Sequence, residues 1–365
     1  MIVYRRRVSS PLNGSGQASP ARDQAAAGRI DWIDAARGIG IILVVYGHVM
    51  RGLVVARLIP ADAFFRQGDT LIYAFHMSLF FVLSGLFARA ARRRGARPFL
   101  WARIRTLAYP YLLWSLVQGV TTLYAGHLAQ HGLSWQAIAS ILWQPIGQFW
   151  FLHALFLCNL ALLPPGRWTL LAITLAGAVT VMAAGGGNAL LIAANSLVAF
   201  SAGAYLGSRR ASALLATPGR AAAVAAGGWF GFALLMMIPA TSGHLAPWLL
   251  GWLRGIAGTL GACGIARLCV RWAPVLVALG QASMAIYLLH VMAVAAIRVA
   301  MEHSGARFGE PAWIVALTLG GLAIPYAAQR IAARLGIENW LGFGADRRGP
   351  SRLGGGALRP SEAVA

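Results

Sequence analysis

The first residues that could carry out chemistry are Arg37 and His48, in the stretch RIDWIDAARGIGIILVVYGHV. On a helix, eleven residues cover about 16 Å and three turns, so both side chains lie on one face. Arginine is a natural partner of phosphate groups, and a neutral histidine can take a proton from a hydroxyl group. The pair therefore suits a long anionic donor. The alternative from spacing alone is a charged anchor at a helix end followed by a packing histidine.

Histidine recurs in three further apolar stretches, at His76, His153 and His290. Four more histidines lie in or beside polar loops: His127, His131, His244 and His303. An ionisable group at membrane depth is costly unless it faces a cavity or a partner. The histidines in apolar stretches therefore predict a shared polar cavity. The alternative for each is a neutral imidazole hydrogen-bonded to a neighbouring helix.

Arg254 is the other unusual charged residue, because it lies inside the apolar stretch WLLGWLRGIAG. An arginine at this depth needs an anion, a cluster of carbonyl groups or water. One interpretation is a structural partner such as Asp69. The other is binding of a carbonyl oxygen or a phosphate group of an anionic donor.

The composition around these residues is that of a membrane protein made of helices. Of the 365 residues, 58% are hydrophobic and 11% are charged, whereas about a quarter of the residues in a soluble domain are charged. We predict an all-α transmembrane bundle of ten spans, since a span needs roughly 20 apolar residues. The predicted spans are 39–58, 71–88, 106–124, 147–163, 168–184, 189–206, 221–239, 246–266, 277–298 and 311–333. Segment 133–146 is shorter, and we expect an interfacial helix there.

The arginines give this predicted bundle an orientation. All 31 basic residues are arginines, and the formal net charge is +21. Of these, 24 lie in the tails and the even-numbered loops, and five lie in the odd-numbered loops and their flanks. Because arginine is enriched in cytosolic loops, both termini are predicted to be cytosolic. Charge spread over short loops between apolar runs also argues against nucleic-acid binding.

The same pattern divides the chain into three parts. Residues 1–29 and 336–365 are predicted to be disordered cytosolic tails, and 30–335 to be the transmembrane domain. In this topology the cavity of the buried histidines opens to the outer side. No metal site is predicted, since the three cysteines lack ligand spacing and no two histidines lie at i and i+4 within a span.

The chain resembles the acyltransferase-3 family of bacterial membrane O-acyltransferases. Arg37, ten intervening residues and His48 look like the signature of that family. Four further segments resemble its motifs in order: FHMSLFFVLSG (75–85), ARIRTLAYPYLLW (102–114), FWFLHALF (149–156) and QASMAIYLLH (281–290). The basic patch departs from the pattern, because two arginines of the family are often separated by two residues and Arg103 and Arg105 by one. The likeness is to members that acetylate exopolysaccharides or surface sugars, including those called fucose-acetylase-like.

This resemblance implies an enzyme of the cytoplasmic (inner) membrane. It implies transfer of an acyl group, acetyl by family frequency, from acyl-coenzyme A as co-substrate to a hydroxyl of a surface carbohydrate such as exopolysaccharide or lipopolysaccharide. It implies donor binding by Arg37, Arg103 and Arg105, and a catalytic pair of Arg37 and His48 in which His48 is the base. No bound cofactor is expected.

The residues themselves add an acceptor cavity to this scheme. We expect its lining to be His76, Trp150, His153, Tyr287 and His290, because aromatic rings suit sugar faces and Tyr and His bond to hydroxyl groups. For Trp150 and Tyr287 the alternative is packing or an interfacial position. The alternative function is a multi-span transporter or flippase for a glycan or a lipid-linked sugar, although the sequence has no internal repeat.

Overall fold

The computed structural model describes residues 30–125, 134–164, 166, 168–184, 187–239, 246–306 and 308–344. Throughout these ranges the regular elements are helices, and none of the described residues forms a strand. The fold class predicted from the sequence, an all-α polytopic protein, is therefore confirmed. The predicted N-terminal tail lies outside the described residues.

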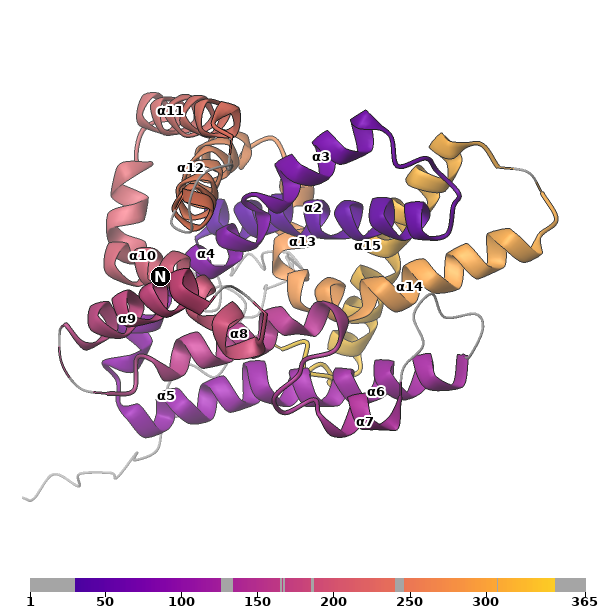
Figure 1. The fold of residues 1–365 in the computed structure, drawn as a ribbon, viewed down its shortest axis with the longest axis horizontal. Helices are drawn as coiled ribbons and strands as arrows, with labels where there is room; N and C mark the ends of the chain where they lie inside the picture. The colour runs from indigo at the N-terminus through magenta and orange to yellow at the C-terminus, as the bar shows by residue number, and fades with distance from the viewer. Residues whose placement is uncertain are drawn as a thin grey trace, which may run out of the picture. The chain divides into compact units, whose positions relative to one another are not determined.

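The helices follow one another along the chain with short connections (Figure 1). In the N-terminal half they are α2 (Asp31–Val55), α3 (Ala63–Tyr73), α4 (His76–Arg92), α5 (Ala96–Arg103), the π-helix η1 (Ile104–Ala108), α6 (Tyr109–Ala125), α7 (Trp135–Ala139), the 3-10 helix η3 (Gly147–Phe149) and α8 (Trp150–Leu160). In the C-terminal half they are α9 (Thr169–Ala184), α10 (Ala189–Leu214), α11 (Pro218–Met237), α12 (Ala246–Cys269), α13 (Pro274–Gln281), α14 (Ser283–His303) and α15 (Glu310–Arg334).

Seven helical segments of the described chain are long and apolar enough to cross a membrane. They are Asp31–Val55, Ala63–Arg92, Ala189–Leu214, Pro218–Met237, Pro247–Cys269, Ser283–His303 and Glu310–Arg334. The other three predicted spans contain the shorter helices α6, α8 and α9, of 17, 11 and 16 residues. Each predicted span thus contains a helix. The number of crossings and the side of the termini remain predictions.

Two pairs of helices approach each other closely through glycine. A Cβ atom on Gly85 of α4 would collide with the Phe200 carbonyl oxygen of α10, and one on Gly203 of α10 would collide with the Val82 carbonyl oxygen of α4. On α13, a Cβ atom on Gly280 would meet the backbone of Asp34 in α2. Small residues at such crossings let backbones pack in direct contact, which stabilises helix pairs in lipid.

The end of the described chain corrects one predicted boundary. Trp114 Nε1 of α6 donates to the Leu341 carbonyl oxygen at 2.8 Å, and the Trp114 ring stacks on the buried Phe343 ring with centroids 5.7 Å apart. Residues 336–344 are therefore folded against α6, so the predicted disordered tail from residue 336 is wrong over this stretch. The tail after residue 335 is rich in Gly and Arg, and this composition does not reveal that Phe343 anchors its first part.

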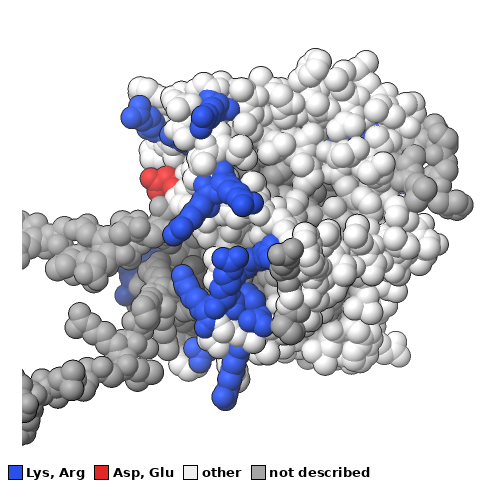
Figure 2. Space-filling model, turned by 90° about the vertical axis from the view of Figure 1, so that its left-hand side faces the viewer, with Lys and Arg blue, Asp and Glu red and all other residues white. Residues whose placement is uncertain are grey.

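Arginine side chains gather on one face of the protein. Figure 2, which looks at the left-hand side of Figure 1, shows many blue side chains and one red patch on that face. This asymmetry agrees with the arginine distribution from which the orientation is predicted.

Candidate active site

His48 lies on α2 and is half-buried. Its Nδ1 atom is 2.8 Å from the carbonyl oxygen of Val44, one turn earlier on the same helix. A carbonyl oxygen only accepts hydrogen bonds, so Nδ1 carries the proton in the neutral ring. Nε2 then carries a lone pair. The helix backbone itself therefore fixes His48 in the tautomer that can act as a base.

His290 of α14 lies beside this imidazole. The two ring centroids are 5.0 Å apart, and the rings meet edge to face at 72°. His290 is fully buried, and its Nδ1 donates to the carbonyl oxygens of Ile286 and Tyr287 at 3.0 and 2.8 Å. Its buried Nε2 has no hydrogen-bond partner among the described residues. A buried acceptor without a donor is costly, which makes this atom a candidate acceptor for a ligand hydroxyl group.

His76, the first residue of α4, repeats the same tautomer. It is buried, and Nδ1 donates to the Ile72 carbonyl oxygen at 2.7 Å. Its ring meets the Tyr73 ring edge to face at 4.6 Å. The Tyr73 ring in turn lies against Gly47, the residue before His48. The structure thus joins His76 to the His48 helix through Tyr73.

A charged pair, Arg51 and Asp69, completes this side of the site. It is not among the site residues predicted from the sequence. Arg51 lies one turn beyond His48 on α2 and makes two hydrogen bonds to the Asp69 carboxylate of α3, at 2.5 and 2.8 Å. The Arg51 guanidinium carbon lies 3.3 Å from the Tyr73 ring centroid. The available signal was spacing: Asp69 and Tyr73 are four residues apart, so they share one face of a helix. Arg51 is one of the five arginines assigned above to the odd-numbered loops and their flanks.

Tyr287 and two glutamines tie the start of α8 to α14. The Tyr287 hydroxyl donates to the Gln148 carbonyl oxygen of η3. The side-chain amides of Gln148 and Gln118 hydrogen-bond each other at 3.2 and 2.7 Å. Tyr287 is buried, with its ring 6.2 Å from that of His290. It belongs to the cluster, but its hydroxyl group is already used in packing.

Trp150 and His153 occupy a neighbouring position on α8. The Trp150 ring packs against those of Phe81 and Phe151, each at 6.4 Å. The Nε2 of His153 donates to the Leu142 carbonyl oxygen at 3.1 Å, and its ring lies 5.5 Å from that of Tyr111. These contacts favour the packing interpretation of Trp150. Neither side chain has a described contact with the rings of His48 and His290.

Three arginines predicted to bind the donor lie outside the histidine cluster. Arg37 is on α2 with His48, and its Nη1 atom lies 3.1 Å from Asp34 Oδ1. Arg103 is half-buried at the end of α5, with its guanidinium carbon 5.1 Å from the Phe99 ring centroid. Arg105 is exposed within η1. Short π-helical segments inside helices often mark functional positions.

Arg254 of α12 binds backbone. Its Nε and Nη2 atoms donate to the Leu235 carbonyl oxygen at 3.1 and 3.0 Å, and Nη2 also donates to the Ile238 carbonyl oxygen at 2.7 Å. These oxygens end α11, where helix carbonyl groups lack intrahelical partners. The suggested pairing with Asp69 is wrong, because Asp69 binds Arg51. Arg92 and Arg267 cap α8 and α10 in the same way, at the carbonyl groups of residues 162–163 and 215–216.

Together the fold and the cluster define a multi-pass helical membrane protein with three neutral histidines gathered between its helices. The chain belongs to the acyltransferase-3 family, because that family's acyltransferase domain matches residues 30–330. It is therefore a membrane acyltransferase, and the family predicted from the sequence is confirmed. No curated protein and no solved structure matches the chain significantly. Among the described residues, no group of His, Cys, Asp and Glu has an arrangement that would hold a metal ion.

Proposed function

We propose that this protein is an O-acyltransferase of the bacterial inner membrane. It moves an acyl group, acetyl in the simplest case, from acyl-coenzyme A on the cytosolic side to a hydroxyl group of a surface or exported carbohydrate. The observation that carries the proposal is the pair formed by His48 and His290. Both rings donate Nδ1 to backbone, so both present the Nε2 lone pair within one cluster.

His48 is the base in the proposed reaction. Its Nε2 takes the proton of the acceptor hydroxyl as the oxygen attacks the thioester carbonyl carbon. The tetrahedral adduct then collapses, the carbon–sulfur bond breaks, and the thiolate of coenzyme A leaves with the proton that His48 held. The products are the ester and free coenzyme A, and His48 is neutral again.

His290 favours a carbohydrate as the acceptor. A neutral imidazole with its Nδ1 proton already bonded can only accept at Nε2. Two such acceptors, with ring centroids 5.0 Å apart, suit a molecule with two neighbouring hydroxyl groups. One hydroxyl would react at His48 while the next donates to His290. A lone alcohol would leave the buried His290 nitrogen without a donor.

The charged pair of Arg51 and Asp69 supports an acceptor site on the same side. The Arg51 and Asp69 side chains remain 46% and 22% exposed, and the pair flanks the Tyr73 ring. A carboxylate accepts hydrogen bonds from sugar hydroxyls, a guanidinium group donates to them, and an aromatic ring covers an apolar sugar face. Arg51 lies beyond His48 along α2, on the side away from Arg37.

The donor side of the proposal is built on arginine. Arg37 precedes His48 by about 16 Å along α2, which leaves room for an extended donor with its phosphates at Arg37 and its thioester at His48. Arg103 and Arg105 supply further positive charge at the predicted cytosolic end. Arginine binds phosphate through paired donors.

The proposal is tested with purified wild type, His48→Ala and His303→Ala in vesicles. His303 is a matched control, since it lies on α14, is exposed and also donates Nδ1 to the carbonyl group four residues earlier. Each protein receives radiolabelled acetyl-coenzyme A and a surface-glycan extract. We expect wild type and His303→Ala to label the glycan and His48→Ala to lose at least a hundredfold in rate. Label transfer by His48→Ala at the wild-type rate would refute the role of His48. Glycan movement across the vesicle membrane without any thioester loss would favour a transporter.

A further inference from the structure

Helix α10 breaks near its end at Gly207. The backbone angles there are φ 72° and ψ 153°, in a region that glycine adopts without strain. The residues beyond Gly207 therefore leave the axis of the preceding helix. The chain then enters α11, whose first turn is capped by Thr217 through a bond from the Arg220 amide at 3.3 Å. The break therefore separates the last turns of α10, residues 208–214, from the rest of that helix.

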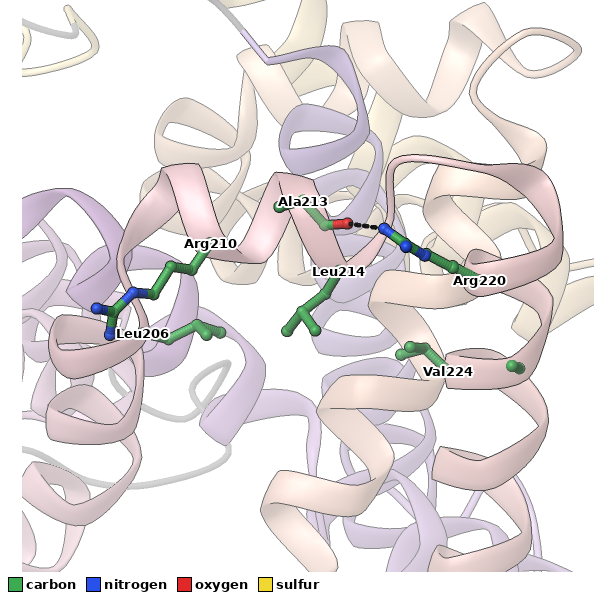
Figure 3. A pocket seen from close by; sticks show the side chains of 7 residues that line it. Leu206, Arg210, Ala213, Leu214, Arg220 and Val224 are labelled. Carbon is green, nitrogen blue, oxygen red and sulfur yellow. Dashed lines mark hydrogen bonds between the residues drawn. The ribbon is translucent and has the colours of Figure 1, made fainter.

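A pocket of about 620 Å³ lies between the end of α10 and the start of α11. Five of the residues that line it are apolar and two are arginines: Leu206, Ala213, Leu214, Ala223, Val224, Arg210 and Arg220. Figure 3 shows Leu206 and Arg210 on one side, Val224 and Arg220 on the other, and Leu214 between them. Leu214 is 50% exposed, so a large apolar side chain at the pocket is left open.

The two arginines have little to neutralise them. Both are exposed, and Arg220 makes one long hydrogen bond, from Nη1 to the Ala213 carbonyl oxygen at 3.4 Å. Among the described residues neither forms a salt bridge. No acidic residue is present among the seven that line the pocket. The pocket therefore combines net positive charge with apolar walls.

Its complement is an amphiphile with an anionic head. The arginines lie in a loop region predicted to be cytosolic, where anionic lipids concentrate and where basic pockets between membrane helices bind their head groups. A small water-soluble anion would contact the guanidinium groups but make no use of Leu206, Leu214 and Val224. A phospholipid would interact with the arginines and with the apolar side chains. Its anionic head group is attracted by Arg210 and Arg220, and its acyl chain covers the apolar side chains.

We propose that the pocket between the end of α10 and the start of α11 binds an anionic phospholipid. Arg210 and Arg220 attract the anionic head group from opposite sides of the pocket, and the apolar residues hold the upper part of an acyl chain. The site shares no residue with the histidine cluster, so it stands apart from the proposed acyl transfer. Its function is to anchor the connection between α10 and α11, on the side predicted to be cytosolic, to the anionic leaflet.

The test is native mass spectrometry of the full chain in detergent, titrated with phosphatidylglycerol or phosphatidylcholine. The variants are Arg210→Gln/Arg220→Gln and the matched control Arg209→Gln, which removes the neighbouring exposed arginine outside the pocket. Wild type and Arg209→Gln should prefer phosphatidylglycerol. The double variant should bind it roughly thirtyfold more weakly, since each arginine near the surface adds about a factor of five, and should bind phosphatidylcholine as wild type does.

Two further arms separate the lipid from other sources of phosphate. Leu214→Ser should also weaken phosphatidylglycerol binding, because the acyl chain loses an apolar contact. Excess glycerol phosphate or coenzyme A should not displace the lipid. The proposal is overturned if wild type binds both lipids equally, if the double variant keeps the wild-type preference, or if either soluble phosphate displaces the lipid. Acyl transfer is not measured, so failure of the proposed enzymatic function would leave this result unchanged.

Discussion

The imidazole rings of His48 and His290 meet edge to face with their centroids 5.0 Å apart, although among the described helices they come from the first and the next-to-last long ones. In each ring Nδ1–H donates a hydrogen bond to a carbonyl oxygen of its own helix. Because each ring carries its proton on Nδ1, each presents Nε2 as a hydrogen-bond acceptor. A pair that differed in tautomer would hydrogen-bond ring to ring and leave a single lone pair for a substrate.

His290→Ala should slow transfer by about ten- to a hundredfold, because the acceptor would lose one hydrogen bond at a buried site. His290→Gln should recover part of the rate, since its amide oxygen can accept a hydrogen bond from the same hydroxyl group. The measurement is the initial rate of label transfer over a range of acceptor concentrations. A purely structural role for His290 would lower the melting temperature of both variants and show no rescue by glutamine.

Asp69→Asn should weaken binding of the acceptor and leave binding of the donor unchanged. The variant keeps the size of the side chain but removes the charge that holds the Arg51 fork beside Tyr73. We expect the KM for the glycan to rise about tenfold and the KM for acetyl-coenzyme A to stay within twofold. Arg51→Lys should act in the same direction, because lysine cannot form the paired bonds. If only the donor KM rises, the charged pair does not belong to the acceptor side.

How far the sequence predicts this site depends on whether the partner of each residue is local. Arg37 and His48 share one helix, so their common face follows from spacing alone. The contact of His48 with His290 depends on the packing of α2 and α14, which no periodicity encodes. The contacts of Arg51 could not be predicted, because its partners lie on α3 and the composition does not reveal the geometry of the turn between α2 and α3. The same limit explains the end of the chain, where stacking of Phe343 on Trp114 outweighs a Gly- and Arg-rich composition.

The crossing of α4 and α10 gives a prediction of stability. Gly85→Ala and Gly203→Ala should each destabilise the protein by about 1–3 kcal/mol, because the added methyl group meets backbone that can move only with its helix. Gly227→Ala is the control, as this glycine also lies within a helix but has no neighbouring atom within 4 Å of the added carbon. Melting temperatures in detergent measure the difference. Equal melting temperatures for all three variants would mean that the two helices do not cross at these glycines.

Variants of Arg254 and Arg37 distinguish a structural arginine from one that binds the donor. The Arg254 guanidinium group donates hydrogen bonds to the Leu235 and Ile238 carbonyl oxygens at the end of α11. Carbonyl groups at a helix end that lack hydrogen-bond partners are costly in lipid. Arg254→Gln should therefore lower the melting temperature and leave the KM for acetyl-coenzyme A unchanged in the protein that stays folded. Arg37→Gln should differ in the donor KM, which should rise about tenfold through the loss of a phosphate contact, in addition to any loss of stability from breaking its ion pair with Asp34. A raised donor KM for Arg254→Gln without a loss of stability would move Arg254 into the donor site, and the capping of α11 would then not be its main role.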